Sequence, residues 1–120
     1  MAAVLLIQKQ IIYYQFGYNG LPYGLNDKTF NWEKSSDFVL DKNSYVVHAE
    51  ANAILNATSN LEGSVVYVTF FPCNECSKLL AQKRISKIIY LEEDTKHLER
   101  VAVSKKILES AGIILEKYKN

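Results

Sequence analysis

Cysteine is scarce in this chain of 120 residues, which contains two cysteines and also only two prolines. The cysteines, Cys73 and Cys76, lie in one C-x-x-C pair, so they cannot form the network of disulfide bonds that stabilises small secreted proteins. In a reducing compartment, such a pair is typical of a metal site or a redox pair. The low cysteine count therefore excludes a disulfide scaffold and directs attention to this pair.

An excess of charge and a long apolar run are also lacking. The 14 lysines and arginines nearly balance the 13 aspartates and glutamates, which gives a net charge of +1. We therefore expect neither nucleic acid nor an anionic membrane as a partner. The apolar start, residues 2–7, is too short for a signal-peptide core, and no other run could span a bilayer. We expect one domain over residues 1–120, soluble and cytoplasmic.

Residue patterns predict an alternation of strands and helices. β-Branched and aromatic runs predict strands at residues 3–7, 11–16, 64–71, 85–91 and 113–118. Apolar residues at helical spacing predict helices at residues 48–57, 73–83 and 96–111. Residues 8–10 should turn a hairpin, and residues 17–44 form a long loop anchored by Phe30 and Trp32. Because a crossover helix separates each pair of later strands, these strands should run parallel. The predicted fold class is α/β, with a five-stranded mixed sheet that opens with an antiparallel hairpin.

Apolar residues in two of these helices indicate buried faces. In the helix at residues 73–83, we expect Cys76, Leu79 and Leu80 to be buried. In the helix at residues 96–111, the expected buried set is Leu98, Val101, Ala102, Ile107 and Leu108. Both helices should pack on the sheet through these side chains.

Three residues have the chemistry of zinc ligands. His48 begins the first predicted helix, and Cys73 and Cys76 begin the second, where free backbone N–H groups favour thiolates. Helices that follow adjacent parallel strands start at the same edge of a sheet, so residues 25 apart can meet there. One imidazole and two thiolates leave a fourth zinc position open, as in catalytic sites. Glu50, two residues from His48, is placed to exchange a proton with water at that position.

Each of these signals is weak when taken alone. A single histidine at a helix start is usually structural, and a single C-x-x-C pair also suits a thiol redox protein. The combination of His48, Glu50 and the cysteine pair, in this order and with a helix after each half, is much more specific. It matches the H-x-E and P-C-x-x-C signature of zinc deaminases.

Three segments carry a resemblance to a known family. They are Gly17-Tyr18-Asn19-Gly20-x-Pro22-x-Gly24, Val47-His48-Ala49-Glu50-x-Asn52-Ala53-Ile54 and Tyr67-Val68-x-x-Phe71-Pro72-Cys73-Asn74-Glu75-Cys76. With them, the chain resembles the cytidine and deoxycytidylate deaminase superfamily, most closely its deoxycytidylate (dCMP) branch. The implied fold is the three-layer cytidine-deaminase-like α/β fold, with helices on both faces of the sheet.

The resemblance also implies a function and the residues that perform it. The expected reaction is zinc-dependent hydrolysis of dCMP to dUMP and ammonia, with one Zn²⁺ per chain, in pyrimidine deoxynucleotide metabolism. The implied zinc ligands are His48, Cys73 and Cys76, and Glu50 is the implied catalytic proton carrier. The remaining implied positions are Asn19 and Ala49 at the substrate and Gly17, Tyr18 and Gly20 in an effector loop. The implied partners are dCTP and dTTP as effectors and further copies of the chain in a homo-oligomer.

Two alternatives stay open on the sequence. One is a deaminase of another cytosine or adenine substrate, such as a free nucleoside or a base in tRNA. The other is a catalytically silent, zinc-containing truncated or regulatory subunit. The resemblance implies a helix before the first strand, whereas this sequence begins within that strand. An apolar sheet face left exposed in this way would favour association between chains.

Overall fold

The computed structural model describes residues 3–7, 14–26, 33–58 and 60–119. Its elements in chain order are β1 (Ala3–Ile7), β2 (Tyr14–Tyr18), the short 3-10 helix η1 (Lys42–Ser44), α1 (Ala49–Asn56), β3 (Val65–Phe70), α2 (Asn74–Gln82), β4 (Lys87–Glu92), α3 (Leu98–Ser110) and β5 (Ile114–Lys117). The turn predicted at residues 8–10, the first half of the second predicted strand, and the aromatic anchors Phe30 and Trp32 lie outside the described residues.

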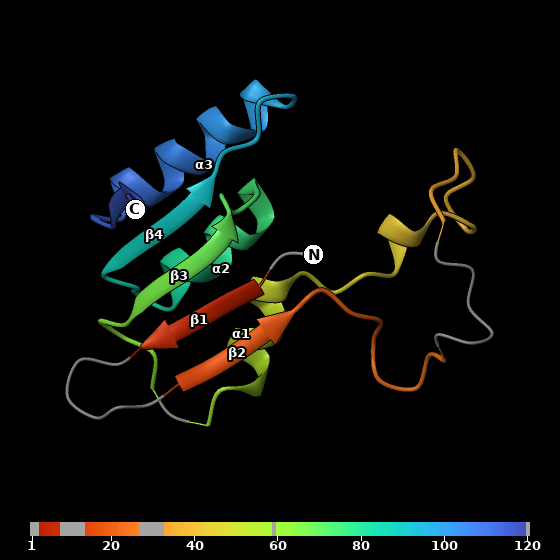
Figure 1. Ribbon diagram of the computed structural model, residues 1–120, viewed down its shortest axis with the longest axis horizontal. Helices are drawn as coiled ribbons and strands as arrows, with labels where there is room; N and C mark the ends of the chain where they lie inside the picture. Colours follow the sequence, from red (N-terminus) through yellow and green to blue (C-terminus); the bar gives the residue numbers. More distant parts are fainter. Residues whose placement is uncertain (1–2, 8–13, 27–32, 59, 120) are drawn as a thin grey trace.

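The strands are arranged in the order β2-β1-β3-β4-β5 (Figure 1). Strand β1 pairs antiparallel with β2 and with β3. The parallel part of the sheet consists of β3, β4 and β5, with Val66 opposite Ile88 and Ile88 opposite Leu115. Helices α2 and α3 connect these three strands, because parallel neighbours require a crossover connection.

The three described α-helices form one layer on a single face of the sheet. Helix α2 contacts both α1 and α3, and Figure 1 shows α1 behind β1 and β2, and α2 behind β3. Two successive right-handed crossovers that step across the sheet in the same direction place their helices on the same face. The predicted fold class, a three-layer arrangement with helices on both faces of a five-stranded mixed sheet, is therefore wrong as stated. The finding that replaces it is an α/β fold in which three helices cover one face of a sheet built around the parallel strands β3, β4 and β5.

The core lies between the parallel strands and this helical layer. Val66, Val68 and Ile88 point toward the helices and are 0–4% exposed, and they meet the fully buried Leu80 of α2 and Leu108 of α3. Alternate strand residues point to the opposite face, where Tyr67 and Ile89 are only half-buried. Burial of each large aliphatic side chain stabilises the fold by about 1.5–3 kcal/mol.

Two expected core leucines lie on the surface. Leu79 is 43% exposed and Leu98 is 69% exposed. Leu79 is placed about 100° around α2 from the fully buried Leu80, and at this position its side chain is turned toward solvent. In α3, the fully buried residues are Ser104 and Leu108, while Ala102 is exposed. The predicted buried face of α3 is therefore partly wrong, because the fully buried positions are Ser104 and the expected Leu108, four residues apart, while Leu98 and Ala102 lie outside this stripe.

The residues predicted to bind zinc lie near the carboxyl ends of the parallel strands. Strand β3 leads through Phe71 and Pro72 into α2, and the Phe71 N–H donates to the carbonyl of Glu92 at the end of β4. On the other side, Gly20 and Val47 exchange two backbone hydrogen bonds of 3.1 and 2.8 Å, which close the base of the segment between β2 and α1. No helix among the described residues is both long and apolar enough to cross a membrane.

Candidate zinc-centred active site

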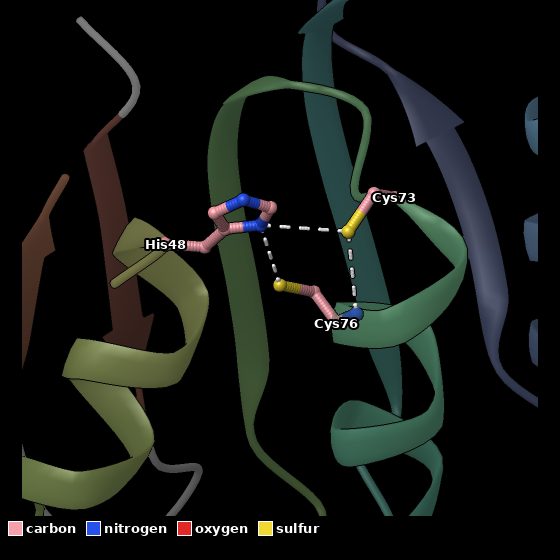
Figure 2. A group of neighbouring side chains, drawn as sticks. All are labelled: His48, Cys73 and Cys76. Atoms are coloured by element: carbon pink, nitrogen blue, oxygen red, sulfur yellow. Dashed lines mark hydrogen bonds between the residues drawn. The ribbon is translucent and has the colours of Figure 1, made fainter. Parts of the chain in front are cut away.

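His48, Cys73 and Cys76 come together at the adjoining starts of α1 and α2 (Figure 2). Their ligand atoms all lie within 4.8 Å of one another. The Nδ1 atom of His48 lies 3.5 Å from the sulfur of Cys73 and 3.3 Å from the sulfur of Cys76. The tertiary structure therefore joins two sequence segments that are 25 residues apart into one cluster.

Helix starts position each of these side chains. Cys73 is the N-cap residue of α2, and its sulfur accepts a hydrogen bond from the Cys76 N–H at 3.4 Å. His48 is the N-cap residue of α1 but makes no side-chain capping bond. Asn19 supplies one instead, because its Oδ1 accepts the Ala49 N–H at 2.8 Å. The His48 ring is thereby left to face the two sulfur atoms.

The donor set fits a zinc ion. In a tetrahedral site with bonds of about 2.3 Å to sulfur and 2.0 Å to nitrogen, sulfur and nitrogen ligands lie about 3.5 Å apart. The two nitrogen–sulfur distances of 3.5 and 3.3 Å agree with this spacing. Cys73 and Cys76 are free cysteines, and a site with three protein ligands retains an open position, which is typical of catalytic zinc.

Hydrogen bonding shifts the pKa values of the Cys73 and Cys76 thiols in opposite directions. A hydrogen bond from Cys76 lowers the pKa of the Cys73 thiol to about 4, and His48 contributes to the same effect. Conversely, the hydrogen bond to Cys73, together with burial, raises the pKa of the Cys76 thiol. The hydrogen bond with Cys73 also raises the pKa of the His48 imidazole. These hydrogen bonds favour the thiolate form of Cys73, which is the form of a cysteine that binds a metal.

Glu50 is buried next to this cluster. It lies in the first turn of α1 and is 7% exposed, and it lines the same pocket as His48 and Cys73. Burial raises the pKa of the Glu50 carboxyl above the usual range of a glutamate. A carboxyl group whose pKa is shifted toward neutrality can both accept and return a proton, which is the property required of a general acid and base.

The pocket is a cavity of about 200 Å³ in which several parts of the chain meet. Of the residues predicted from sequence, Asn19, His48, Glu50 and Cys73 line it. Sequence reasoning missed the other lining residues, which are Phe70, Phe71, Pro72, Asp94, Arg100, Val101 and Ser104. The signal that could have found Asp94 is its place just after β4, since adjacent parallel strands end at a common ligand-binding edge.

The remaining predicted site residues are placed away from this cavity lining. Ala49 is fully buried, and its N–H is bonded to Asn19. Gly17 and Tyr18 lie in strand β2, and Gly20 forms the bridge to Val47. A Cβ atom at Gly17 would lie 2.2 Å from the Ala49 carbonyl oxygen. The structure thus gives Gly17 a packing role against α1, and effector binding at Gly17, Tyr18 and Gly20 stays a prediction.

Comparison with known proteins supports the same chemistry. The cytidine and deoxycytidylate deaminase zinc-binding region matches residues 1–92. A probable deoxycytidylate deaminase of Drosophila melanogaster is 43% identical over 104 residues, which are 81% of this chain and 51% of that protein. Deoxycytidylate deaminase of Mus musculus is 38% identical over 104 residues, which are 85% of this chain and 58% of that protein.

A solved structure resembles the whole described fold. The dCMP deaminase of cyanophage S-TIM5, crystallised in complex with dCMP and dUMP, matches with a TM-score of 0.73 and 26% sequence identity. The match covers 98% of this chain and 80% of the phage chain. The chain spans about half the length of the curated relatives above, at 51% and 58%. On the extent of the family match and on these identities, the chain belongs to the cytidine and deoxycytidylate deaminase zinc-binding family.

Proposed function

We propose that this chain catalyses the zinc-dependent hydrolysis of dCMP to dUMP and ammonia. The observation that carries the proposal is the cluster of His48, Cys73 and Cys76 beside the buried Glu50 in one cavity. Relatives named deoxycytidylate deaminase support dCMP as the substrate, and so does the phage dCMP deaminase, whose structure contains dCMP and dUMP.

In this proposal, His48, Cys73 and Cys76 hold the ion, and Glu50 moves the proton. When bound, zinc would act as a Lewis acid and lower the pKa of a water molecule to about 7. The Glu50 carboxylate would take a proton from the attacking water and deliver it to the ring nitrogen beside C4 of the cytosine. Ammonia leaves from C4 and oxygen from the water replaces it, so dCMP and one water give dUMP and one ammonia. Positioned proton transfer of this kind typically contributes about 10²–10⁴-fold to a rate.

The test is ammonia release from dCMP by purified, zinc-loaded protein, with Glu50→Gln measured alongside. Glu75→Gln is the matched control, because Glu75 also lies beside a predicted ligand, but its side chain is 72% exposed and pairs with Lys78. We expect turnover by the native chain and by the control, and a loss of at least about 10²-fold in Glu50→Gln. A folded protein that binds one zinc per chain but releases no ammonia would refute the activity and favour a catalytically silent subunit. Turnover of cytidine or an adenine substrate in preference to dCMP would refute the substrate assignment.

We also propose homo-oligomerisation, regulation by dCTP and dTTP, and a cytoplasmic location. Support for self-association comes from Phe38, Val39 and Leu40, consecutive apolar residues that are 72, 69 and 55% exposed, since clustered exposed apolar side chains mark interaction surfaces. A reducing compartment suits Cys73 and Cys76, which are free cysteines. Light scattering of the purified protein tests the oligomer. Assays with added dCTP or dTTP test the regulation.

A further inference from the structure

One wall of the pocket takes no part in the proton transfer assigned to Glu50. Helix α3 and the connection before it contribute Asp94, Arg100, Val101 and Ser104 to the lining of the cavity. This wall follows β4, which is the strand next to β3 in the sheet. Because the zinc ligands come from α1 and α2, the α3 wall is placed to contact a part of the substrate other than the reacting ring atoms.

Arg100 provides a positive charge at this wall. Apart from His48, it is the one basic side chain among the described residues that line the cavity. Asp94, the acidic neighbour at the wall, is already engaged: Oδ1 accepts the N–H groups of Lys96 and His97, and Oδ2 pairs with His97 at 2.7 Å. Within the described part of the chain, Arg100 forms no ion pair. Its guanidinium is therefore available to an anionic ligand.

Ser104 adds a second donor on the same stripe of the helix. Residues four positions apart in a helix lie one above the other, so Ser104 sits one turn beyond Arg100. Ser104 is fully buried, and its hydroxyl finds no hydrogen-bond partner among the described residues. Leaving a buried hydroxyl unpaired costs about 1–3 kcal/mol, which makes such a group unusual in a folded protein. A ligand oxygen in the cavity would satisfy it.

We propose that Arg100, assisted by Ser104, binds the 5′-phosphate of the substrate and so selects a nucleotide over a nucleoside. The proposal rests on the proposed function and names the residues that determine specificity at the same site. A guanidinium presents paired N–H donors that match two phosphate oxygens, and charge-assisted bonds of this kind are the stronger class of hydrogen bond. Arg100 also lies in the first turn of α3, where the helix dipole favours a negatively charged ligand.

The experiment compares kcat and KM for dCMP and for deoxycytidine in the native protein, Arg100→Gln and Lys96→Gln. Lys96→Gln is the matched control, because it removes the same charge close to the start of α3 from a residue that does not line the cavity. We expect Arg100→Gln to lower kcat/KM for dCMP by about 10- to 100-fold, mainly through KM. Its kcat/KM for deoxycytidine should be unchanged, and Lys96→Gln should resemble the native protein with both substrates.

Ser104→Ala separates ligand binding from structure. Removal of an unpaired buried hydroxyl should leave the melting temperature unchanged or raise it, while the KM for dCMP increases. A lower melting temperature with an unaltered KM would show that Ser104 has only a structural role. Rescue of dCMP selectivity in Arg100→Lys is expected to be partial, since an ammonium lacks the paired donors of a guanidinium.

The outcomes distinguish this proposal from the proposed function. An unchanged ratio of dCMP to deoxycytidine turnover in Arg100→Gln would overturn phosphate binding while leaving the deaminase in place. If the native protein deaminates neither compound, the proposed function fails, and calorimetry with dUMP and deoxyuridine then decides the phosphate question. Tighter binding of dUMP that is lost in Arg100→Gln supports it, whereas equal binding of the two ligands refutes it.

Discussion

Asn19 caps a helix that begins 30 residues later in the chain. Its Oδ1 accepts the N–H of Ala49 at 2.8 Å, at the first position of α1. The residue that would normally cap this helix is His48, which makes no side-chain capping bond. The bond from Asn19 therefore leaves the His48 ring to face the cysteines, and Asn19 also lines the cavity.

Replacement of Asn19 should separate the capping role from the substrate role. Asn19→Ala leaves the buried Ala49 N–H unpaired, so we expect the free energy of unfolding to fall by about 1–3 kcal/mol. Asn19→Asp retains the acceptor oxygen and should unfold close to the native value, but it loses the amide donors and should deaminate dCMP more slowly. Urea unfolding and dCMP kinetics of both variants test this. Equal destabilisation of the two would contradict the capping role.

A side chain at position 17 should force β2 and α1 apart. In Gly17→Ala, the added Cβ would lie 2.2 Å from the Ala49 carbonyl oxygen and 2.6 Å from the Ala53 nitrogen, both of which are backbone atoms. We expect the free energy of unfolding to fall by at least about 1–3 kcal/mol, as in other overpacked sites, and zinc affinity to weaken because His48 precedes Ala49.

Gly20→Ala is the matched control for Gly17→Ala. The nearest atom to a Cβ at Gly20 is the Asn52 side-chain nitrogen, 3.9 Å away, so this substitution meets no obstacle. Its unfolding curve and zinc content should be close to those of the native protein. Equal losses of stability and zinc content in Gly17→Ala and Gly20→Ala would show that the close contact at Gly17 is not their cause.

Removal of zinc should destabilise the fold, because the ion would bridge the starts of α1 and α2. A metal that is bound at 100 times its dissociation constant stabilises by about 2.7 kcal/mol. For a domain of this size, we expect chelation to lower the melting temperature by about 10 °C. Cys76→Ser should melt at the lower temperature with or without chelator. If the chelator does not change the melting temperature of the native protein, the cluster does not hold a structurally important ion.

Stability should also depend on the charge of Asp94 in acid. Hydrogen bonds from the N–H of Lys96, and then from His97, lower the pKa of the Asp94 carboxyl in the folded chain. This contribution to stability is therefore present above the usual aspartate pKa of 3.8, and it is lost as the pH falls through the lower folded-state value. Asp94→Asn, which still accepts both N–H groups, should melt below the native protein near neutral pH. The difference should disappear in strong acid, and a difference that does not change with pH would exclude the charge as its cause.

The zinc cluster was predictable because its chemistry is encoded over short distances. The C-x-x-C spacing puts Cys73 and Cys76 on one helical turn, and the start of a helix at Ala49 places His48 at its amino end. Both features follow from local pattern, and the structure confirms that the three ligand atoms gather within 4.8 Å. The proton-carrier role of Glu50 and the substrate role of Asn19 stay predictions for the assays above.

The α3 wall was not predictable in the same way. Helical spacing suggested that Leu98 is buried, but it is 69% exposed, whereas Ser104 is fully buried. A serine is an ordinary residue on a helix surface, and only the packing of α3 against the sheet shows that this one lines the pocket. Likewise, no local pattern shows that Arg100 faces the cavity rather than solvent alone.

The sequence by itself determined the ligand chemistry, the order of strands and helices after residue 48, and the family, because these depend on residue type and on spacings within a few positions. Tertiary structure decided that the three described α-helices share one face of the sheet, since each lies in a right-handed crossover that steps across the sheet in the same direction. It also decided that Asn19 caps Ala49 and that Arg100 and Ser104 reach the pocket of Glu50. Contacts between segments so distant in the chain depend on how the layers pack, and this packing brings the residues of the site together.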